Sequence, residues 1–231
     1  MVSASRPYEN GQLHIQNFNN DFLLIRAEGA VNLAQLGQYW HQQHYPFVRE
    51  VIVAEREICL QLHPDFTETD LDLLFQPVPK TSIQPRGYSL PIRFSPVEDW
   101  RQIIQHTGRS REAIIEELCA QTFSVAMFGF LPGFLYLRGL PEHLQVPRKA
   151  VPAKYVPAGS IAIGGAYLGA YAVDSPGGWH IIGQTPLRLL HSQQLPPSPF
   201  QVGDQIRLRP IDEQAYKTIL ADENYTPSLY A

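Results

Sequence analysis

Short β-prone runs alternate with turn residues in the first third of the chain. The runs LHIQNF and DFLLIRA, within residues 13–27, flank Asn19-Asn20, a pair that tolerates positive φ, and they predict a hairpin. The runs EVIVAE and EICLQLH, at residues 50–55 and 57–63, repeat this strand–turn–strand signal. The pattern therefore predicts an antiparallel sheet early in the chain.

Two helical patterns and one more strand accompany these hairpins. Asn32 begins a helical pattern that extends to about Gln43, and Thr67–Phe75 carries leucines at helical spacing behind a Thr/Asp-rich start. A last strand is predicted over Tyr88–Phe94, after the linker QPVPKTSIQPRG. This order of elements predicts a small α+β domain over residues 1–94, with the helices on one face of a sheet.

The sequence pattern changes twice after residue 94. Two helices are predicted, Pro96–His106 and Arg111–Ala120, and the hydroxyl of Ser110 is placed to cap the second by accepting a first-turn N–H. These helices make residues 95–121 a helical linker. Short apolar runs separated by Pro and Gly follow, and they predict a sheet-rich barrel or sandwich over residues 122–231.

Composition narrows the class of protein. The 231 residues are 44% hydrophobic, and 18 Lys and Arg against 22 Asp and Glu give a net charge of −4 without a basic block. This balance disfavours nucleic-acid binding. The first residues are polar and no apolar run approaches the roughly 18 residues of a membrane span, so we expect a cytoplasmic protein that does not insert in a membrane.

Cysteine and histidine are sparsely placed. Cys59 and Cys119 are the only two cysteines, each inside an apolar run, which indicates neither a disulfide framework nor a zinc site. Among the eight histidines, only His41 and His44 lie three residues apart, in a predicted exposed helix end. We therefore predict no metal ligands.

Four loop motifs in the second half combine turn residues with aromatic, hydroxyl or cationic side chains. They are GFLPGFLYL (129–137), VPRK (146–149), VPAGS (156–160) and DSPGGW (174–179). Glycine lets a backbone approach a ligand and turn its N–H groups toward an anion, which suits a carboxylate, a phosphate or an oxyanion. Arg148 and Lys149 add charge. The aromatic rings of the first motif are interpreted mainly as packing, and the alternative for all four motifs is that they are only the corners of a barrel.

The motifs occur in the order of one known family. GFLPGFLYL, LPEHLQVPRK, VPAGSIAIGG, SPGGWHIIGQTPL and VGDQIRLRPI resemble, at closely similar spacing, the motifs of the family of 5-oxoprolinase B subunits, also called allophanate hydrolase subunit 1 or KipI-like. The resemblance is strong over residues 123–211 and weaker before them. It implies an N-terminal ferredoxin-like α+β domain and a C-terminal cyclophilin-like β-barrel.

The resemblance also implies a function. Such proteins act with a C-type, or KipA-like, partner and with an A-type partner to open 5-oxoproline to L-glutamate, using ATP and Mg²⁺. No GxxxxGK[ST] string occurs in the sequence, so any nucleotide site is expected to be unconventional or shared with a partner protein. Three alternatives remain. They are a KipI-like inhibitor that binds a sensor histidine kinase and blocks its autophosphorylation, a carboxyltransferase-like module related to urea carboxylase, for which the sequence offers no biotin-carrier site, and a paralogue that kept the fold and lost the chemistry.

Residue chemistry and the resemblance select the candidate site residues. The catalytic candidates are Arg148, Lys154, Ser175 and Thr185. The residues expected to bind substrate are Phe134, Tyr136, Arg148, Gly164, Gly165, Gly177, Gly178 and Trp179. His180 is expected to face the opposite side of its strand from Trp179. Asp204 is interpreted as a hairpin-turn residue.

Four positions depart from the family pattern. Residues 94–100 replace a Gly-rich stretch, and Cys119 stands where a His is frequent, which argues against proton transfer by a His there. Pro152-Ala153-Lys154 replaces a second Pro-Arg and leaves Lys154 as a displaced cation, and Gln184 stands where Arg or His is common. These departures indicate a divergent member.

Overall fold

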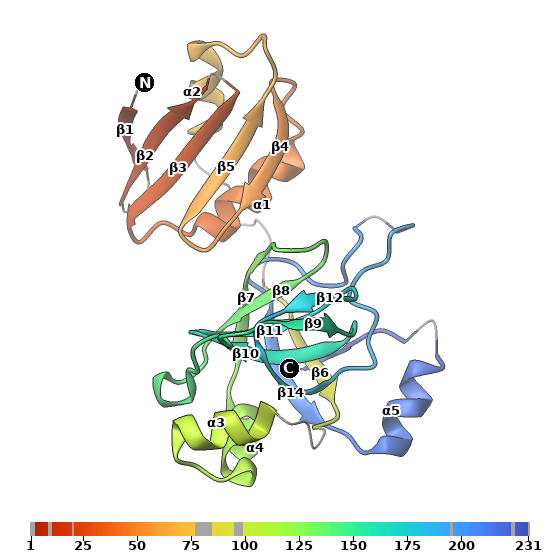
Figure 1. The fold of residues 1–231 in the computed structure, drawn as a ribbon. Helices are drawn as coiled ribbons and strands as arrows, with labels where there is room; N and C mark the ends of the chain where they lie inside the picture. The colour runs from red at the N-terminus through yellow and green to blue at the C-terminus, as the bar shows by residue number, and fades with distance from the viewer. Residues whose placement is uncertain are drawn as a thin grey trace. The chain divides into compact units, whose positions relative to one another are not determined.

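The chain folds into two compact units, Met1–Gln84 and Pro85–Ala231, each with its own hydrophobic core (Figure 1). The computed structural model describes residues 3–8, 11–19, 21–76, 85–94, 99–194, 196–222 and 225–230. Both units combine sheets with a few helices, so the coarse prediction of a chain with both kinds of element is confirmed.

The first unit is a five-stranded antiparallel sheet with helices on one face (Figure 1). Its strand order is β1-β2-β3-β5-β4. The bounds are β1 Ser3–Tyr8, β2 Gly11–Phe18, β3 Phe22–Gly29, α1 Leu33–Gln43, β4 Val48–Val53, β5 Glu57–Leu62, a 3-10 turn Glu68–Asp70 and α2 Leu71–Leu74. The indole N–H of Trp40 in α1 donates to the carbonyl of Leu74 in α2 at 2.8 Å, which ties the two helices together.

Local sequence signals explain most of this unit. Asn19 has φ 54° in the β2–β3 turn, and the Asn32 side chain accepts from Gln35 N–H at 3.0 Å at the start of α1. The predicted hairpin and helix start are therefore confirmed. Helix α1 joins β3 to β4, with β5 paired between these strands. The ferredoxin-like assignment of this arrangement stays a prediction.

The second unit is a β-barrel built on one eight-stranded sheet. Its order is β13-β10-β11-β8-β7-β14-β6-β15. The bounds are β6 Gly87–Ile92, β7 Phe123–Phe128, β8 Leu135–Arg138, β10 Ser160–Gly164, β11 Tyr167–Ala170, β13 His180–Gln184, β14 Gln205–Pro210 and β15 Ser228–Leu229. Reciprocal backbone bonds between Arg93 and Gln184, at 2.8 and 3.0 Å, join β6 to β13 and close the barrel.

The strand predicted to end the first unit belongs to the second. β6 pairs in parallel with β14 and antiparallel with β15, so the predicted boundary at residue 94 differs from the structural division after Gln84. Helices α3 (Asp99–Thr107) and α4 (Arg111–Ala120) were predicted as a linker, but their apolar faces are buried in the barrel core. The pairing partner of β6 lies more than a hundred residues further along the chain, where local sequence patterns give no information about it.

Two details of the second unit bear on the predictions. Ser110 caps α4 as predicted, since its hydroxyl accepts from Ala113 N–H at 3.2 Å. Asp204 is fully buried, and its carboxylate accepts from the backbone N–H groups of Arg86 and Gln201, both at 2.9 Å. Asp204 is therefore not only a turn residue. Its buried carboxylate links the segments that lead into β6 and β14. Helix α5 (Glu213–Leu220) follows β14.

Side chains alternate between the inside and the outside of the barrel wall. Along β8, Leu135 and Leu137 face the main core, while Tyr136 and the preceding Phe134 join a second, aromatic cluster on the outer face. The two-stranded sheet of β9 (Ala153–Val156) and β12 (Ser175–Gly177) contributes to this outer cluster. The alternation therefore creates an aromatic surface outside the barrel.

No helix in the described parts of the chain is both long enough and apolar enough to cross a membrane.

Candidate functional site

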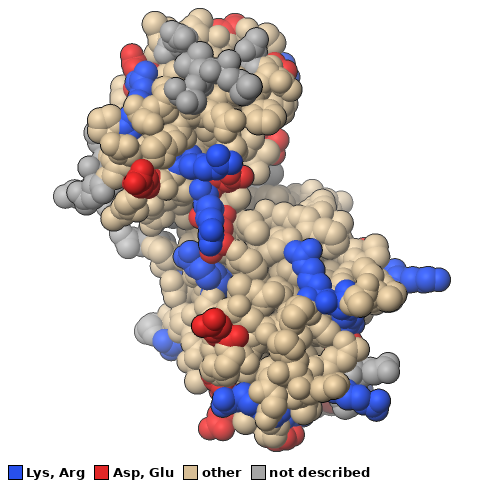
Figure 2. Space-filling view, turned by 60° about the vertical axis from the view of Figure 1, so that its left-hand side comes forward, with Lys and Arg blue, Asp and Glu red and all other residues tan. Residues whose placement is uncertain are grey.

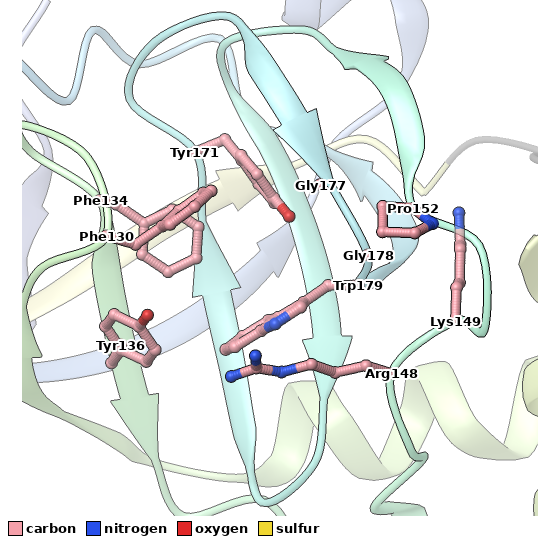
Figure 3. Close-up of a pocket in the computed structure, with 10 residues that line it drawn as sticks. All are labelled: Phe130, Phe134, Tyr136, Arg148, Lys149, Pro152, Tyr171, Gly177, Gly178 and Trp179. Carbon is pink, nitrogen blue, oxygen red and sulfur yellow. The ribbon is translucent and has the colours of Figure 1, made fainter.

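A cavity of about 160 Å³ lies on this outer aromatic surface (Figure 3). Six of the residues predicted to bind substrate line it: Phe134, Tyr136, Arg148, Gly177, Gly178 and Trp179. They come from three of the four loop motifs, which are far apart in sequence. Their convergence is a property of the fold, and their role as substrate contacts stays a prediction.

Several other predicted site residues lie elsewhere. Lys154 is exposed on β9 and does not line the cavity. Ser175 is buried on β12 and is not one of the residues that line the cavity. Thr185 is buried too, and its hydroxyl accepts from Leu187 N–H at 3.3 Å beside a different hollow. The sequence pattern identified these as polar groups near turns but gave no information on the direction of their side chains.

The predicted glycines divide between packing and lining. A Cβ on Gly164 would lie 2.2 Å from the Trp179 ring, so this glycine lets the indole rest against the barrel wall. Gly165 has φ 61° in the β10–β11 turn with open space around it, and it does not line the cavity. A Cβ on Gly177 would lie 2.4 Å from the Tyr171 hydroxyl. Two of these glycines thus make room for aromatic rings.

The aromatic side chains form an edge-to-face arrangement around Phe134. Its ring centroid lies 4.9 Å from that of Tyr136, 4.8 Å from Tyr171 and 5.6 Å from Trp179. Tyr136 and Trp179 also meet edge to face at 5.5 Å. Such pairs are preferred over face-to-face stacks because the ring edges are positive and the faces negative. The predicted packing role of these aromatics is therefore present, and the same rings form the cavity wall.

Arg148 and Lys149 have different environments. The guanidinium carbon of Arg148 lies 5.9 Å from the Trp179 ring centroid, and this side chain forms no ion pair or hydrogen bond with any residue that the structure describes. Lys149 instead pairs with Asp99 at 2.6 Å. Because the ammonium is neutralised by that carboxylate, Arg148 supplies the unpaired positive charge of the cavity (Figure 3).

Sequence reasoning did not select Tyr171, which is only 1% exposed and lines the cavity. Burial raises the pKa of its hydroxyl to about 12, although a hydrogen bond from the backbone of Trp179 opposes the shift. The hydroxyl therefore stays protonated at neutral pH. Its position on the outer face after β11 follows from strand alternation, which was the available signal.

Phe130, predicted as a packing residue, stands at the cavity edge in a strained turn. Leu131 N–H donates to Gly129 C=O at 2.7 Å, which closes a three-residue turn around Phe130 at φ 64°. Positive φ is unfavourable for a bulky residue. The Phe130 ring is 62% exposed and meets Phe134 edge to face at 5.6 Å. The strained turn thus holds an aromatic ring at the cavity mouth.

His180 faces away from Trp179, as strand alternation predicts. Its Nε2 lies 2.9 Å from the carbonyl oxygen of Pro147, and the ring is 3% exposed. Desolvation by burial lowers its pKa, while the Pro147 bond opposes this shift. The Pro147 carbonyl requires a proton on Nε2, so Nδ1 carries the lone pair in the neutral ring.

The lining residues and the volume of the cavity limit which ligands it can bind. Within the ranges that the structure describes, no three His, Cys, Asp or Glu side chains gather into a group suited to a metal ion. Pockets for larger organic ligands usually measure about 300–1,000 Å³. The cavity, at about 160 Å³, is smaller than this.

The surface charges are mixed. Figure 2 shows Lys and Arg side chains separated by Asp and Glu side chains and by uncharged surface. This distribution agrees with the small net charge.

The sequence pattern of the family described as carboxyltransferase domain, subdomain C and D, matches residues 13–200. The chain belongs to this family. It is similar to proteins named as the B subunit of 5-oxoprolinase from Haemophilus influenzae (37% identity over 59% of this chain and 65% of the relative), Bacillus subtilis (35%, over 54% and 52%) and Escherichia coli O157:H7 (40%, over 50% and 53%). These matches confirm the resemblance to the family of 5-oxoprolinase B subunits.

Solved structures agree with the family assignment. The structure of TTHA0988 superposes with a TM-score of 0.74 and 25% identity, over 83% of this chain and 40% of that chain. The Kluyveromyces lactis urea amidolyase superposes with a TM-score of 0.71 over 98% of this chain and 17% of that one, at 16% identity, which supports the fold alone. The chain spans about half to two thirds of the curated relatives that it matches.

Proposed function

We propose that this chain is the B subunit of an ATP-dependent 5-oxoprolinase complex that opens 5-oxoproline to L-glutamate in the cytoplasm. The observation that carries the proposal is its 35–40% identity with three relatives named as the B subunit of 5-oxoprolinase. The word subunit in these names implies an enzyme of several chains. We propose a C-type, or KipA-like, protein and an A-type protein of the same enzyme as the partners.

The cavity supports a role in handling a small anionic substrate. Its volume suits a small molecule, its walls are aromatic, and Arg148 offers a guanidinium that no described side chain neutralises. A guanidinium pairs well with a carboxylate because both groups are planar and form two parallel hydrogen bonds. 5-Oxoproline carries one carboxylate on a small ring, so it has the size and charge that this cavity favours.

The volume of this cavity lies below the usual range for larger organic ligands, which favours an ATP site elsewhere. We propose that the nucleotide, with Mg²⁺, binds at a site shared with or supplied by a partner protein. The sequence has no GxxxxGK[ST] string, in agreement with that proposal. The chain by itself is then inactive, and activity requires the assembled complex.

The finer fold assignments belong to the same proposal. We infer that the first unit is ferredoxin-like, because α1 links β3 and β4 on either side of the inserted β5. We infer that the closed barrel of the second unit is cyclophilin-like. A solved structure of this chain, superposed unit by unit on members of both classes, checks each inference separately.

The function is tested by glutamate release from 5-oxoproline. The full chain is purified with and without its co-encoded C-type and A-type partners and assayed with ATP and Mg²⁺. Glutamate formed only by the complete mixture supports the proposal, and its loss with an Arg148→Ala chain that still co-purifies with its partners would assign Arg148 a part in the reaction. A correctly assembled complex without turnover overturns it, and binding to a sensor histidine kinase is then measured.

A further inference from the structure

Two hydrogen-bond donors in the cavity have no acceptor among the residues that the structure describes. One is the guanidinium of Arg148, which has five N–H donors and no acceptor capacity. The other is the hydroxyl proton of Tyr171. Its oxygen accepts from the backbone N–H of Trp179, so one lone pair is used while the proton remains available.

The Tyr171 hydroxyl is held in place and aimed into the cavity. The side chain is buried, its ring packs edge to face on Phe134 at 4.8 Å, and the hydroxyl points toward Gly177 (Figure 3). A Cβ at residue 177 would lie 2.4 Å from this oxygen, so glycine at this position lets the hydroxyl lie close against the backbone of residue 177. Buried hydroxyls normally have their hydrogen bonds made, which indicates that a ligand acceptor belongs here.

The walls define the rest of the ligand. Tyr136, Trp179 and Phe134 present flat apolar surfaces, and Arg148 lies along the Trp179 indole. A ligand cation is disfavoured because the guanidinium already occupies a position over that indole. The cavity therefore favours a small flat molecule with an anionic group at one end and a neutral hydrogen-bond acceptor at the other.

We propose that the cavity binds a small cyclic acid with an amide carbonyl, in which Arg148 pairs with the carboxylate and Tyr171 donates to the carbonyl oxygen. This inference rests on the proposed function, since 5-oxoproline has both groups on one five-membered ring. Donation from Tyr171 also stabilises the negative charge that develops on the carbonyl oxygen when the amide carbon is attacked. Tyr171 is then a further substrate contact, and its hydroxyl polarises the carbonyl group of the substrate.

Three ligands test the two contacts without any change to the protein. Calorimetry with the full chain, alone and mixed with its partner proteins, compares 5-oxoproline, 2-pyrrolidinone, which lacks the carboxylate, and cyclopentanecarboxylate, which lacks the amide. Loss of either contact is expected to weaken binding about tenfold or more, because each leaves a donor without an acceptor. Equal affinity for all three ligands, or no saturable binding of 5-oxoproline under either condition, overturns the inference.

Variants then assign each contact to its residue. Tyr171→Phe keeps the ring and is expected to weaken 5-oxoproline binding about tenfold while leaving cyclopentanecarboxylate unchanged. Arg148→Met is expected to weaken 5-oxoproline about tenfold or more and leave 2-pyrrolidinone unchanged. Arg101→Met, on the exposed surface of α3, is the matched charge control. Uniform loss for all ligands in both variants contradicts the assignment.

The outcomes separate this inference from the proposed function. If the assembled complex releases glutamate at the wild-type rate with both variants, the recognition scheme is wrong and the function stands. If the complex releases no glutamate but the chain discriminates the three ligands as expected, the function is wrong and the recognition of small cyclic acids stands.

Discussion

At the scale of single residues, the cavity depends on where side chains are missing as much as on where they are present. Trp179 rests against the barrel wall only because Gly164 and Gly169 have no Cβ, since each added atom would lie 2.2 or 2.5 Å from the indole. Trp179 in turn supports the Arg148 guanidinium and donates to Tyr171. The two glycines therefore fix the position of both polar groups of the site.

Gly164→Ala is expected to displace the indole and to destabilise the fold by about 1–3 kcal/mol, the usual cost of overpacking. The tryptophan fluorescence should change, because the Trp179 ring is displaced from its position against the barrel wall. The matched control is Gly129→Ala, where a Cβ would meet only Tyr136, at 3.8 Å. Urea unfolding and fluorescence spectra check both variants, and equal stability of the two would contradict this account.

A second prediction at this scale concerns pH. The pKa of His180 is lowered from 6.5 chiefly by burial, and Asp99, Lys149 and His106 are its titratable neighbours. At this residue, the unfolded chain therefore binds more protons than the folded chain just below pH 6.5. The contribution of His180 to stability is present above that pH and is lost as the pH falls through 6.5 toward the lowered folded value.

His180→Gln removes this titration and retains a side-chain N–H that can reach the Pro147 carbonyl. Urea midpoints measured from pH 7.5 to 5.5 should fall less steeply for the variant than for the natural chain. Parallel curves for the two proteins would show that His180 does not contribute to the acid sensitivity.

At the scale of elements, the segment that carries Arg148 is tied to the barrel on both sides of that residue. Val146 C=O accepts from Gly165 N–H at 2.8 Å, and Lys149 N–H donates to Gly178 C=O at 2.7 Å. The Lys149 side chain then reaches Asp99 at the start of α3, whose carboxylate also accepts from Ile181 N–H at 2.7 Å. Helix α3, strand β13 and this loop thus meet at one carboxylate.

This junction predicts strong coupling between Asp99 and Lys149. Their side chains are 13% and 15% exposed, so either partner alone is left as a poorly solvated charge. A double-mutant cycle with Asp99→Asn and Lys149→Met is expected to give a coupling free energy of about 1–3 kcal/mol in urea unfolding. The exposed pair Glu213–Lys217 is the control, at about 0.3–0.5 kcal/mol. Similar couplings for the two pairs would contradict a structural role for the junction.

Among the elements, some features could be predicted from the sequence and others could not. The β2–β3 turn, α1 and α4 were predicted because Asn19, Asn32 and Ser110 act on their own neighbours. The cavity residues were predicted in part because Pro- and Gly-rich loops mark barrel ends. Tyr171 was not selected, although strand alternation was an available signal for its facing. Ser175, a predicted catalytic residue, does not line the cavity, because the facing of a residue in a short strand depends on its register with partners far along the chain.

At the scale of the whole molecule, the two units have separate cores. Leu13, Trp40 and Leu60 belong to the core of the first unit, whereas the barrel core draws on β6, both helices that follow it and the later barrel strands. A unit with its own core is expected to fold alone. The position of the division therefore decides which fragments are stable.

This leads to a prediction about two polypeptides that differ by the segment 85–94. Residues 85–231 include β6, which fills the place between β14 and β15 and closes the barrel through Arg93 and Gln184. They should fold cooperatively. Residues 95–231, which begin at the boundary suggested by the sequence pattern, lack this strand, leave the buried carboxylate of Asp204 without its Arg86 partner and expose one edge of β14.

Thermal unfolding followed by circular dichroism, together with the dispersion of amide signals in NMR spectra, distinguishes the two polypeptides. The longer one should unfold in a single transition with dispersed signals, and the shorter one should aggregate or lack a transition, because open strand edges associate. Addition of a peptide covering residues 85–94 should partly restore the shorter one by supplying β6 in trans. A well-folded 95–231 polypeptide would mean that the barrel closes without β6, and the division after Gln84 would then have no energetic significance.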